Sequence, residues 1–204
     1  MQSLRPIIFL VFLVVPAPSS AQNTDIETLI TLNLERNTKL DQTFLAITHS
    51  FGPVSLAVPA TLMTIGAIKK DSLSKQNALM ITGSLVGSSV IMLGMKWGFA
   101  RERPFTTYPE LDNLVHPKDP SFPSGHTSVA FSTASSLTIA YPKWYVYVPA
   151  FLWAGAVGYS RMHLGVHYPS DVLVGAIIGS GSTFLSSYLT RKIQLKRRSK
   201  KLQL

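Results

Sequence analysis

Five apolar stretches constrain the fold of this 204-residue chain more than any other feature. They lie at 53–68, 77–95, 127–141, 144–159 and 172–189, and Gly, Ser, Thr or Ala interrupts each of them. Small residues allow helices to approach one another closely inside a membrane. Several stretches are shorter than the ~20 residues of a usual span. On length alone, a soluble helical bundle with a very apolar core is therefore an alternative.

The composition excludes several other classes of protein. Apolar residues make up 46% of the chain and charged residues 14%, against about 25% charged in an ordinary soluble domain. Such a chain is too apolar to be disordered. It contains no cysteine, which excludes a disulfide scaffold and a cysteine-ligated zinc or iron site. The 10 acidic residues disfavour a carboxylate metal site.

The distribution of charge favours a membrane protein. If the chain starts outside after residue 21 and crosses five times, the inner side holds 12 Lys/Arg and one acid, and the outer side holds 7 Lys/Arg and 9 acids. Excess Lys and Arg in short inner loops is the usual pattern of membrane proteins. The sequence thus predicts an all-α polytopic membrane bundle with about five transmembrane helices.

The two ends of the chain differ from the bundle. Residues 1–21 resemble a secretory signal peptide with a small-residue cleavage site, and an uncleaved anchor is the alternative. Residues 191–204 hold seven Lys/Arg and no acid, and we interpret them as a basic cytoplasmic tail rather than a nucleic-acid-binding one. One domain is expected between them, at 22–190.

Residues 25–50 show a helical spacing of apolar positions that is broken near Asn37. We expect two short amphipathic helices here, with Asn23-Thr24-Asp25 as a cap for the first one. They would lie at the outer membrane interface or pack against the bundle.

Lys96 and Arg103 are seven residues apart, near the outer end of the second stretch. Seven residues are two helical turns, so a helix would present both cations on one face, and Pro104 would end that helix. Two cations in this position repel each other unless an anion lies between them. A pair of membrane-edge cations is the alternative.

The sequence Pro-Ser-Gly-His at 123–126 opens the third stretch. A helix N-terminus presents free N–H groups and a positive dipole end to an anion. Gly125 permits close backbone approach, Ser124 adds a hydroxyl donor, and His126 can give or take a proton. Taken alone, the same residues also fit an ordinary helix start.

Arg161, His167 and Asp171 lie near the outer ends of the last two stretches. Pro169 suits the first turn of the final helix, so His167 precedes that helix and Asp171 lies in its first turn. A carboxylate this close can accept the N–H of one imidazole nitrogen and leave the lone pair of the other free. A histidine nucleophile requires this arrangement. A plain hydrogen bond at a helix start is the alternative.

The predicted topology brings all three clusters to the outer membrane surface. Together they supply three cations, helix N–H donors, two histidines and one carboxylate. Phosphoryl transfer requires such positioning and stabilisation of negative charge. Because no carboxylate group suited to Mg²⁺ accompanies the cations, Arg and Lys would take the place of a metal.

The pattern resembles the three-part signature of the type 2 phosphatidic acid phosphatase (PAP2) superfamily. The eleven matching positions fall in 96–171 and form the motifs Lys96-x6-Arg103-Pro104, Pro123-Ser124-Gly125-His126 and Ser160-Arg161-x5-His167-x3-Asp171. The resemblance implies that His167 is a nucleophile that forms a phosphohistidine, that Asp171 orients it, and that His126 protonates the leaving oxygen and then activates water. It also implies a phosphate cradle made by Lys96, Arg103, Ser124, Gly125 and Arg161, and chemistry without a metal or cofactor.

The expected function is therefore hydrolysis of a lipid phosphomonoester or diphosphate at the outer face of a membrane. The candidate substrates are phosphatidate, phosphatidylglycerol phosphate, undecaprenyl diphosphate and lipid A phosphates, in a bacterial inner membrane with the site facing the periplasm. A soluble secreted acid phosphatase or a vanadium haloperoxidase would use the same constellation, and a non-enzymatic headgroup-binding bundle is a third alternative. The choice of substrate and the oligomeric state stay open, and no nucleic-acid partner is expected.

Overall fold

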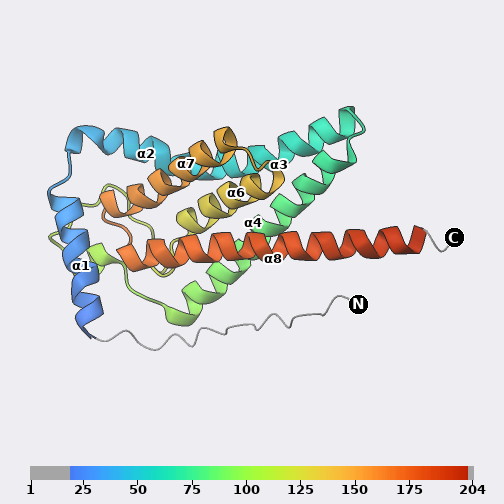
Figure 1. Ribbon diagram of the computed structural model, residues 1–204. Coiled ribbons are helices and arrows are strands. Elements are labelled where there is room, and N and C mark those ends of the chain that lie inside the picture. Colours follow the sequence, from blue (N-terminus) through green and yellow to red (C-terminus); the bar gives the residue numbers. More distant parts are fainter. Residues whose placement is uncertain (1–18, 202–204) are drawn as a thin grey trace.

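The computed structural model describes residues 19–201, and the secondary structure of these residues is entirely helical, as predicted (Figure 1). The helices are α1 (Ser19–Leu34), the 3-10 helix η1 (Thr38–Leu40), α2 (Asp41–His49), α3 (Phe51–Ile68), α4 (Ser72–Phe99), α5 (Pro104–Thr107), α6 (Gly125–Ala140), α7 (Trp144–His163) and α8 (Pro169–Lys201). Apart from residues 19–21, which belong to α1, the expected signal peptide lies outside the described residues.

Five helices, α3, α4, α6, α7 and α8, form the bundle, and each accounts for one of the five apolar stretches. The turn between α3 and α4 and the C-terminal end of α8 lie at one end of the bundle, whereas α1 crosses the other end (Figure 1). The expected basic tail continues α8 as a helix to Lys201, and residues 202–204 lie outside the described part.

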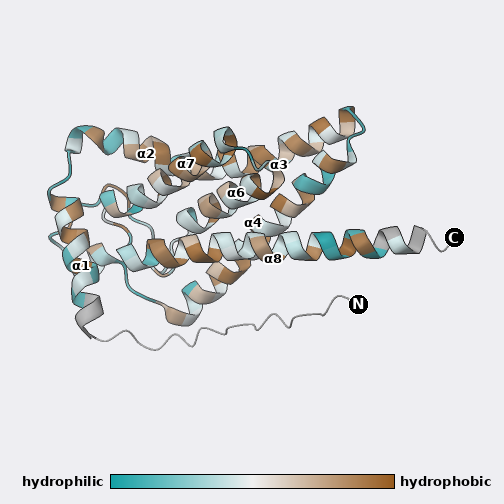
Figure 2. Cartoon of the chain, in the orientation of Figure 1, coloured by the Kyte–Doolittle hydropathy of each residue, from teal (hydrophilic) through white to brown (hydrophobic). Residues whose placement is uncertain are grey.

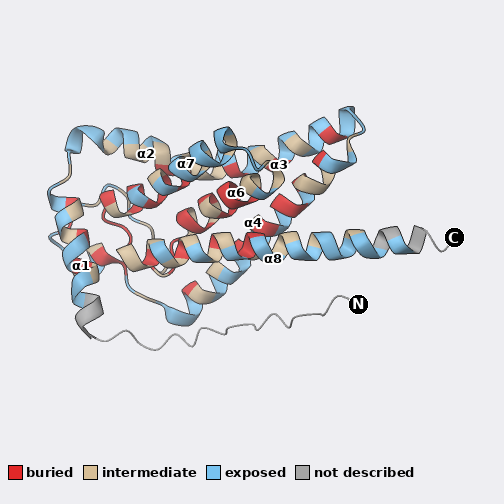
Figure 3. Cartoon of the chain, viewed as in Figure 1, coloured by how far each residue is buried: buried red, intermediate tan, exposed pale blue. Residues whose placement is uncertain are grey.

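Three segments of the described chain are long and apolar enough to cross a membrane: Thr38–Ile68, Ser72–Thr107 and Pro169–Lys196. Large apolar side chains such as Val90 on α4 and Ile177 on α8 are exposed on the surface of the bundle, where hydrophobic and exposed positions coincide (Figures 2 and 3). Such a surface suits lipid rather than water. The prediction of a membrane bundle is confirmed, but the expected number of five spans is not.

Helix α6 forms the centre of the bundle and packs against α4, α7 and α8. Its buried face consists of small residues, and hydroxyl groups connect it to its neighbours. Ser84 Oγ lies 2.6 Å from Ser132 Oγ and 2.6 Å from Thr183 Oγ1, while Ser88 Oγ lies 2.6 Å from Ser128 Oγ. These contacts satisfy hydroxyls that would otherwise be buried without partners. They also fix the positions of α4, α6 and α8 relative to one another along the bundle.

Two glycines of α8 allow α6 to approach unusually closely. A Cβ atom on Gly179 would lie 2.1 Å from the backbone oxygen of Ser128, and one on Gly175 would lie 2.6 Å from that of Ser124. Since backbone atoms cannot move aside as a flexible side chain can, any larger residue here would separate the helices. The close approach brings the start of α6 beside the start of α8, where Ser124 N–H donates to the backbone oxygen of Asp171.

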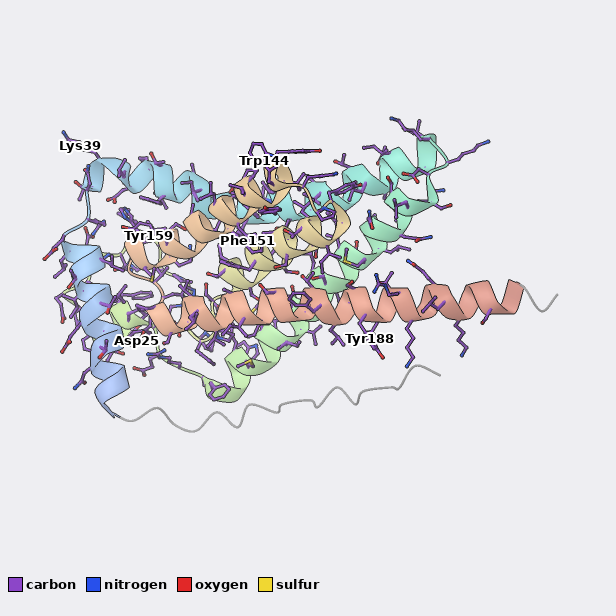
Figure 4. The ribbon with its side chains drawn as sticks, in the orientation of Figure 1. Asp25, Lys39, Trp144, Phe151, Tyr159 and Tyr188 are labelled. Carbon is purple, nitrogen blue, oxygen red and sulfur yellow. The ribbon has the colours of Figure 1, made fainter. Side chains whose placement is uncertain are left out.

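The two helices expected within 25–50 are α1 and α2. Helix α1 packs against the bundle through Ile26 and Leu29, which contact Leu111 and Tyr168. The expected cap is wrong, because Asp25 lies inside α1. Its carboxylate instead accepts hydrogen bonds from the backbone N–H (2.8 Å) and the hydroxyl (2.5 Å) of Ser170. This contact attaches α1 to the beginning of α8 (Figure 4).

Candidate active site

Lys96 and Arg103 do not share one helix. Helix α4 ends at Phe99, Ala100 adopts a left-handed conformation with φ of 46°, and Arg103 precedes α5. The prediction that Pro104 ends a helix is wrong, because proline is also well suited to the first position of a helix, and Pro104 begins α5. The α-helix is therefore interrupted between the two cations.

Both cations nevertheless meet at one carboxylate, that of Asp119 in the long loop between α5 and α6. Lys96 Nζ lies 2.8 Å from Asp119 Oδ2, and Arg103 Nη2 lies 2.8 Å from Asp119 Oδ1. Lys96 also donates to the backbone oxygen of Pro120, and Arg103 Nε donates to that of Asp119 at 2.8 Å. The cations are buried, whereas the Asp119 side chain is 48% exposed.

The ionisation of Asp119 reflects this pairing. Burial alone would raise the pKa of its carboxyl, but the hydrogen bonds and charges of Lys96 and Arg103 dominate and lower the pKa to about 2. Asp119 is therefore a carboxylate at any physiological pH.

His167 lies in the turn between α7 and α8, beside Arg103 and Asp171. Its Nδ1 is 3.3 Å from Asp171 Oδ2, and its Nε2 is 3.3 Å from Arg103 Nη1. Because Asp171 accepts from Nδ1–H, Nε2 retains the lone pair. Burial lowers the pKa of His167 to about 4, although the hydrogen bond to Asp171 acts in the opposite direction. At neutral pH the imidazole is uncharged, and the lone pair of Nε2 faces Arg103 Nη1–H.

Asp171 is fully buried and every oxygen of its carboxylate has partners. Oδ1 accepts from Arg101 Nη1 at 2.9 Å, and Oδ2 accepts from the backbone N–H of Tyr168 at 3.0 Å and from the Ser121 hydroxyl. These bonds hold the carboxylate in one orientation. Sequence reasoning did not identify Arg101 or Ser121 as site residues.

Arg101 connects the site to α1. Its Nη2 lies 2.9 Å from Asp25 Oδ2, its Nη1 donates to Ser170 Oγ at 2.8 Å, and its guanidinium carbon lies 3.7 Å from the centre of the Tyr168 ring. Two arginines separated by one residue thus serve different groups. In an extended segment, residues two apart point to the same side, and residues 101 and 103 are both arginine. This spacing is the sequence signal that could have drawn attention to Arg101 beside Arg103.

The remaining predicted residues surround the same region. Ser124 precedes α6, and its hydroxyl lies 2.9 Å from Thr127 Oγ1. Gly125 begins α6, where a Cβ atom would lie 3.2 Å from the Met92 side chain. His126 follows it, with its ring centre 3.8 Å from that of Phe51, and is within electrostatic range of Arg161 and His167.

Arg161 is buried on α7. Its Nη1 donates to Thr48 Oγ1 at 2.7 Å, and its Nε is buried with no hydrogen-bond partner among the described residues. A buried guanidinium with an unused N–H can still donate that N–H to a bound anion. Arg161 is thus the cation of the three predicted ones that has no carboxylate partner among the described ion pairs.

His163 belongs to a separate polar cluster on the same side of the bundle. Its Nε2 lies 2.7 Å from Asp41 Oδ1, and Arg36 Nε lies 3.0 Å from the same oxygen. Asn33 donates to the backbone oxygen of His163 at 3.0 Å. This cluster connects α1, α2 and α7, which explains the burial of His163 without a metal.

Fold and site together define a class of protein: a membrane helical bundle with buried cations beside a histidine that is paired with an aspartate. The PAP2 superfamily model matches residues 77–195, and the chain belongs to this superfamily. The resemblance seen in the sequence motifs is therefore confirmed.

Known proteins of the superfamily are similar over much of the described chain. The undecaprenyl-diphosphatase of Sulfolobus acidocaldarius is 39% identical over 47% of this chain and 48% of its own length. The crystal structure of Aquifex aeolicus LpxE has a TM-score of 0.70 at 26% identity and covers 81% of this chain and 95% of that one. The Bacillus subtilis transmembrane PAP2-type phosphatidylglycerolphosphate phosphatase also has a TM-score of 0.70 at 26% identity, covering 86% and 89%. The chain spans about half the length of the curated relatives it matches.

Proposed function

We propose that this protein is a lipid phosphatase that hydrolyses a terminal phosphate or diphosphate headgroup through a phosphohistidine at His167, without a metal. The observation that carries the proposal is the environment of His167. One imidazole nitrogen faces the buried carboxylate of Asp171 and the other faces Arg103. An unprotonated nitrogen that faces a cation able to bind phosphate is placed for attack on phosphorus once the phosphate takes over the N–H of that cation.

In the first step, Nε2 of His167 attacks phosphorus, a bond forms between nitrogen and phosphorus, and the bond to the leaving oxygen breaks. Nδ1–H remains hydrogen-bonded to Asp171, which stabilises the positive charge that develops on the ring. Lys96, Arg103 and Arg161 stabilise the negative charge on the phosphoryl oxygens. Backbone N–H groups at the start of α6, after Ser124, supply further donors.

His126 is proposed to complete both proton transfers. It gives a proton to the leaving oxygen in the first step and takes one from water in the second. The activated water then attacks phosphorus, the bond from nitrogen to phosphorus breaks, and inorganic phosphate leaves. His126 lies on the first turn of α6, within electrostatic range of His167 and Arg161. These neighbours favour the neutral base that activates water, and a bound phosphate dianion would favour the protonated form that the leaving oxygen requires.

The names of the relatives and the surroundings of the site support a lipid phosphate as the substrate. The similar proteins are named for undecaprenyl diphosphate and phosphatidylglycerolphosphate. A site at one end of a lipid-exposed bundle suits a molecule with its tail in the membrane and its phosphate in water. We assign the site to the periplasmic side and the basic end of α8 to the cytoplasm, because Lys69, Lys70 and the cations of 191–204 then follow the positive-inside pattern.

Phosphate release by detergent-purified protein in EDTA tests the proposal. The substrates are the four candidate lipid phosphates, with p-nitrophenyl phosphate as a water-soluble ester. We expect release from at least one lipid phosphate and a loss of at least ~10³-fold in the His167→Ala variant, since the covalent step is removed.

His116→Ala provides the matched control, because His116 is an exposed loop histidine whose described contact is with the Phe105 ring. It should retain wild-type turnover. Wild-type turnover in His167→Ala would contradict the proposed nucleophile. Release from the soluble ester alone would indicate a phosphatase of small phosphomonoesters instead.

A further inference from the structure

Asp119 lies where two oxygens of a bound phosphate are expected. We propose that Asp119 keeps the proposed phosphatase site free of weakly bound anions: its carboxylate competes with every phosphate for Lys96 and Arg103, so a monoanionic phosphodiester binds too weakly to stay, whereas a terminal phosphate of higher charge binds tightly enough to displace it. This inference rests on the proposed function and explains how the site stays available to its substrate.

The geometry supports a competing role for Asp119. Each carboxylate oxygen contacts one cation, Oδ2 at 2.8 Å from Lys96 and Oδ1 at 2.8 Å from Arg103. A phosphate held by the same two cations would use two of its oxygens in the same way. The carboxylate and the phosphate therefore cannot both occupy these positions.

The burial of the three groups shows which of them can move. The side chains of Lys96 and Arg103 are 4% and 6% exposed, whereas that of Asp119 is 48% exposed. Asp119 also belongs to the loop 108–124, which contains no helix or strand. Its carboxylate can turn into water without uncovering the core, but neither cation can leave. Acid does not release it, because the pKa of Asp119 is about 2.

The consequence concerns charge. A phosphodiester headgroup carries one negative charge, and a phosphomonoester carries about 1.5 to 2 at neutral pH. A membrane presents phosphodiesters in large excess at the depth of the proposed site. A diester carries the same single negative charge as the Asp119 carboxylate and therefore has no electrostatic advantage over it. A terminal phosphate or diphosphate carries more negative charge than the carboxylate and has such an advantage. Without Asp119, the two cations would retain abundant diesters.

Two measurements on the detergent-purified full chain test this inference. Titration calorimetry with inorganic phosphate gives the dissociation constant of the anion, and phosphatidylglycerol in mixed micelles gives the inhibition by a diester. If the carboxylate occupies the cations ~90% of the time, Asp119→Asn should bind phosphate ~10-fold more tightly. The same variant should be inhibited by phosphatidylglycerol at a ~10-fold lower mole fraction.

Two variants serve as controls. Asp119→Glu retains a carboxylate on the loop and should stay close to wild type in both measurements. Glu110→Gln removes an exposed charge from the same loop, which controls for a general electrostatic effect. The melting temperature of each variant shows whether it is folded.

Unchanged or weaker phosphate binding in a folded Asp119→Asn variant would overturn the inference, because a purely structural bridge would predict that result. The test is separate from that of the proposed function. If no lipid phosphate is hydrolysed but Asp119→Asn still binds phosphate more tightly than Asp119→Glu, the competition holds and the phosphatase proposal fails.

Discussion

At the scale of single residues, Arg101 is expected to position the nucleophile without touching the substrate. It holds Asp171 Oδ1, and Asp171 in turn holds His167. Losing a hydrogen bond to a charged group costs about 1.5–3 kcal/mol, so Arg101→Gln should lower kcat about 10- to 100-fold with little change in KM.

The pH profile distinguishes this role from a loss of structure. Removing the positive charge of Arg101 should raise the pKa of His167 above its value of about 4, so the acid limb of kcat/KM should move to higher pH. Arg101→Lys retains the charge and should partly restore the wild-type pH profile. Lys118→Gln removes an exposed charge and serves as the control, so its pH profile should match that of the wild type. An acid limb that stays in place in Arg101→Gln would argue against the positioning role.

The motif spacing placed His167 and Asp171 on adjacent parts of the chain, and the structure has them within hydrogen-bond distance. Motif spacing could not predict that Asp119 and Ser121 belong to the site, because their contacts depend on the path of an irregular loop. Nor could it predict Asp25, which reaches Ser170 from 145 residues away. Local periodicity carries no information on such contacts.

At the scale of elements, the approach of α6 to α8 makes a sharp prediction about two neighbouring glycines. Gly179→Ala would place Cβ against the backbone oxygen of Ser128, while Gly181→Ala would place it in open space. Overpacking costs about 1–3 kcal/mol, and each kcal/mol lowers the melting temperature by ~2–4 °C in a chain of this size. Gly179→Ala should therefore melt several degrees lower and Gly181→Ala should not.

Phosphate release should fall in the same Gly179→Ala variant, because separating α6 from α8 weakens the bond from Ser124 N–H to Asp171 O. Equal melting temperatures for the two alanine variants would show that the helices adjust to the extra methyl group.

Apolar patterning predicted the five bundle helices because each contains one of the five apolar stretches. It misjudged the end of α4 because Pro104 fits a helix start as well as a helix end. It also missed the length of α1, whose first residues overlap the expected cleavage site.

At the scale of the whole molecule, the proposed topology places the loop after α5 and the turn between α3 and α4 on opposite sides of the membrane. The chain contains no cysteine, so single cysteines report position without background. A membrane-impermeant maleimide should label Glu110→Cys in intact cells, and should label Lys69→Cys only after the membrane is permeabilised. Labelling of both in intact cells would contradict the topology.

The hydroxyl contacts of α6 have a consequence for how the protein is made. Helix α6 has 16 residues and is not among the segments that are long and apolar enough to cross a membrane. Its Ser132 lies near Ser84 of α4, and the backbone oxygen of Ser132 accepts a hydrogen bond from Thr183 of α8. A polar helix enters lipid at low cost only when its neighbours satisfy its hydroxyls. Helix α4 can meet these hydroxyls before α8 is made, but the bond from Thr183 and the carboxylate of Asp171 both come from α8. We therefore expect His167 to gain its orienting carboxylate only after α8 has joined the bundle.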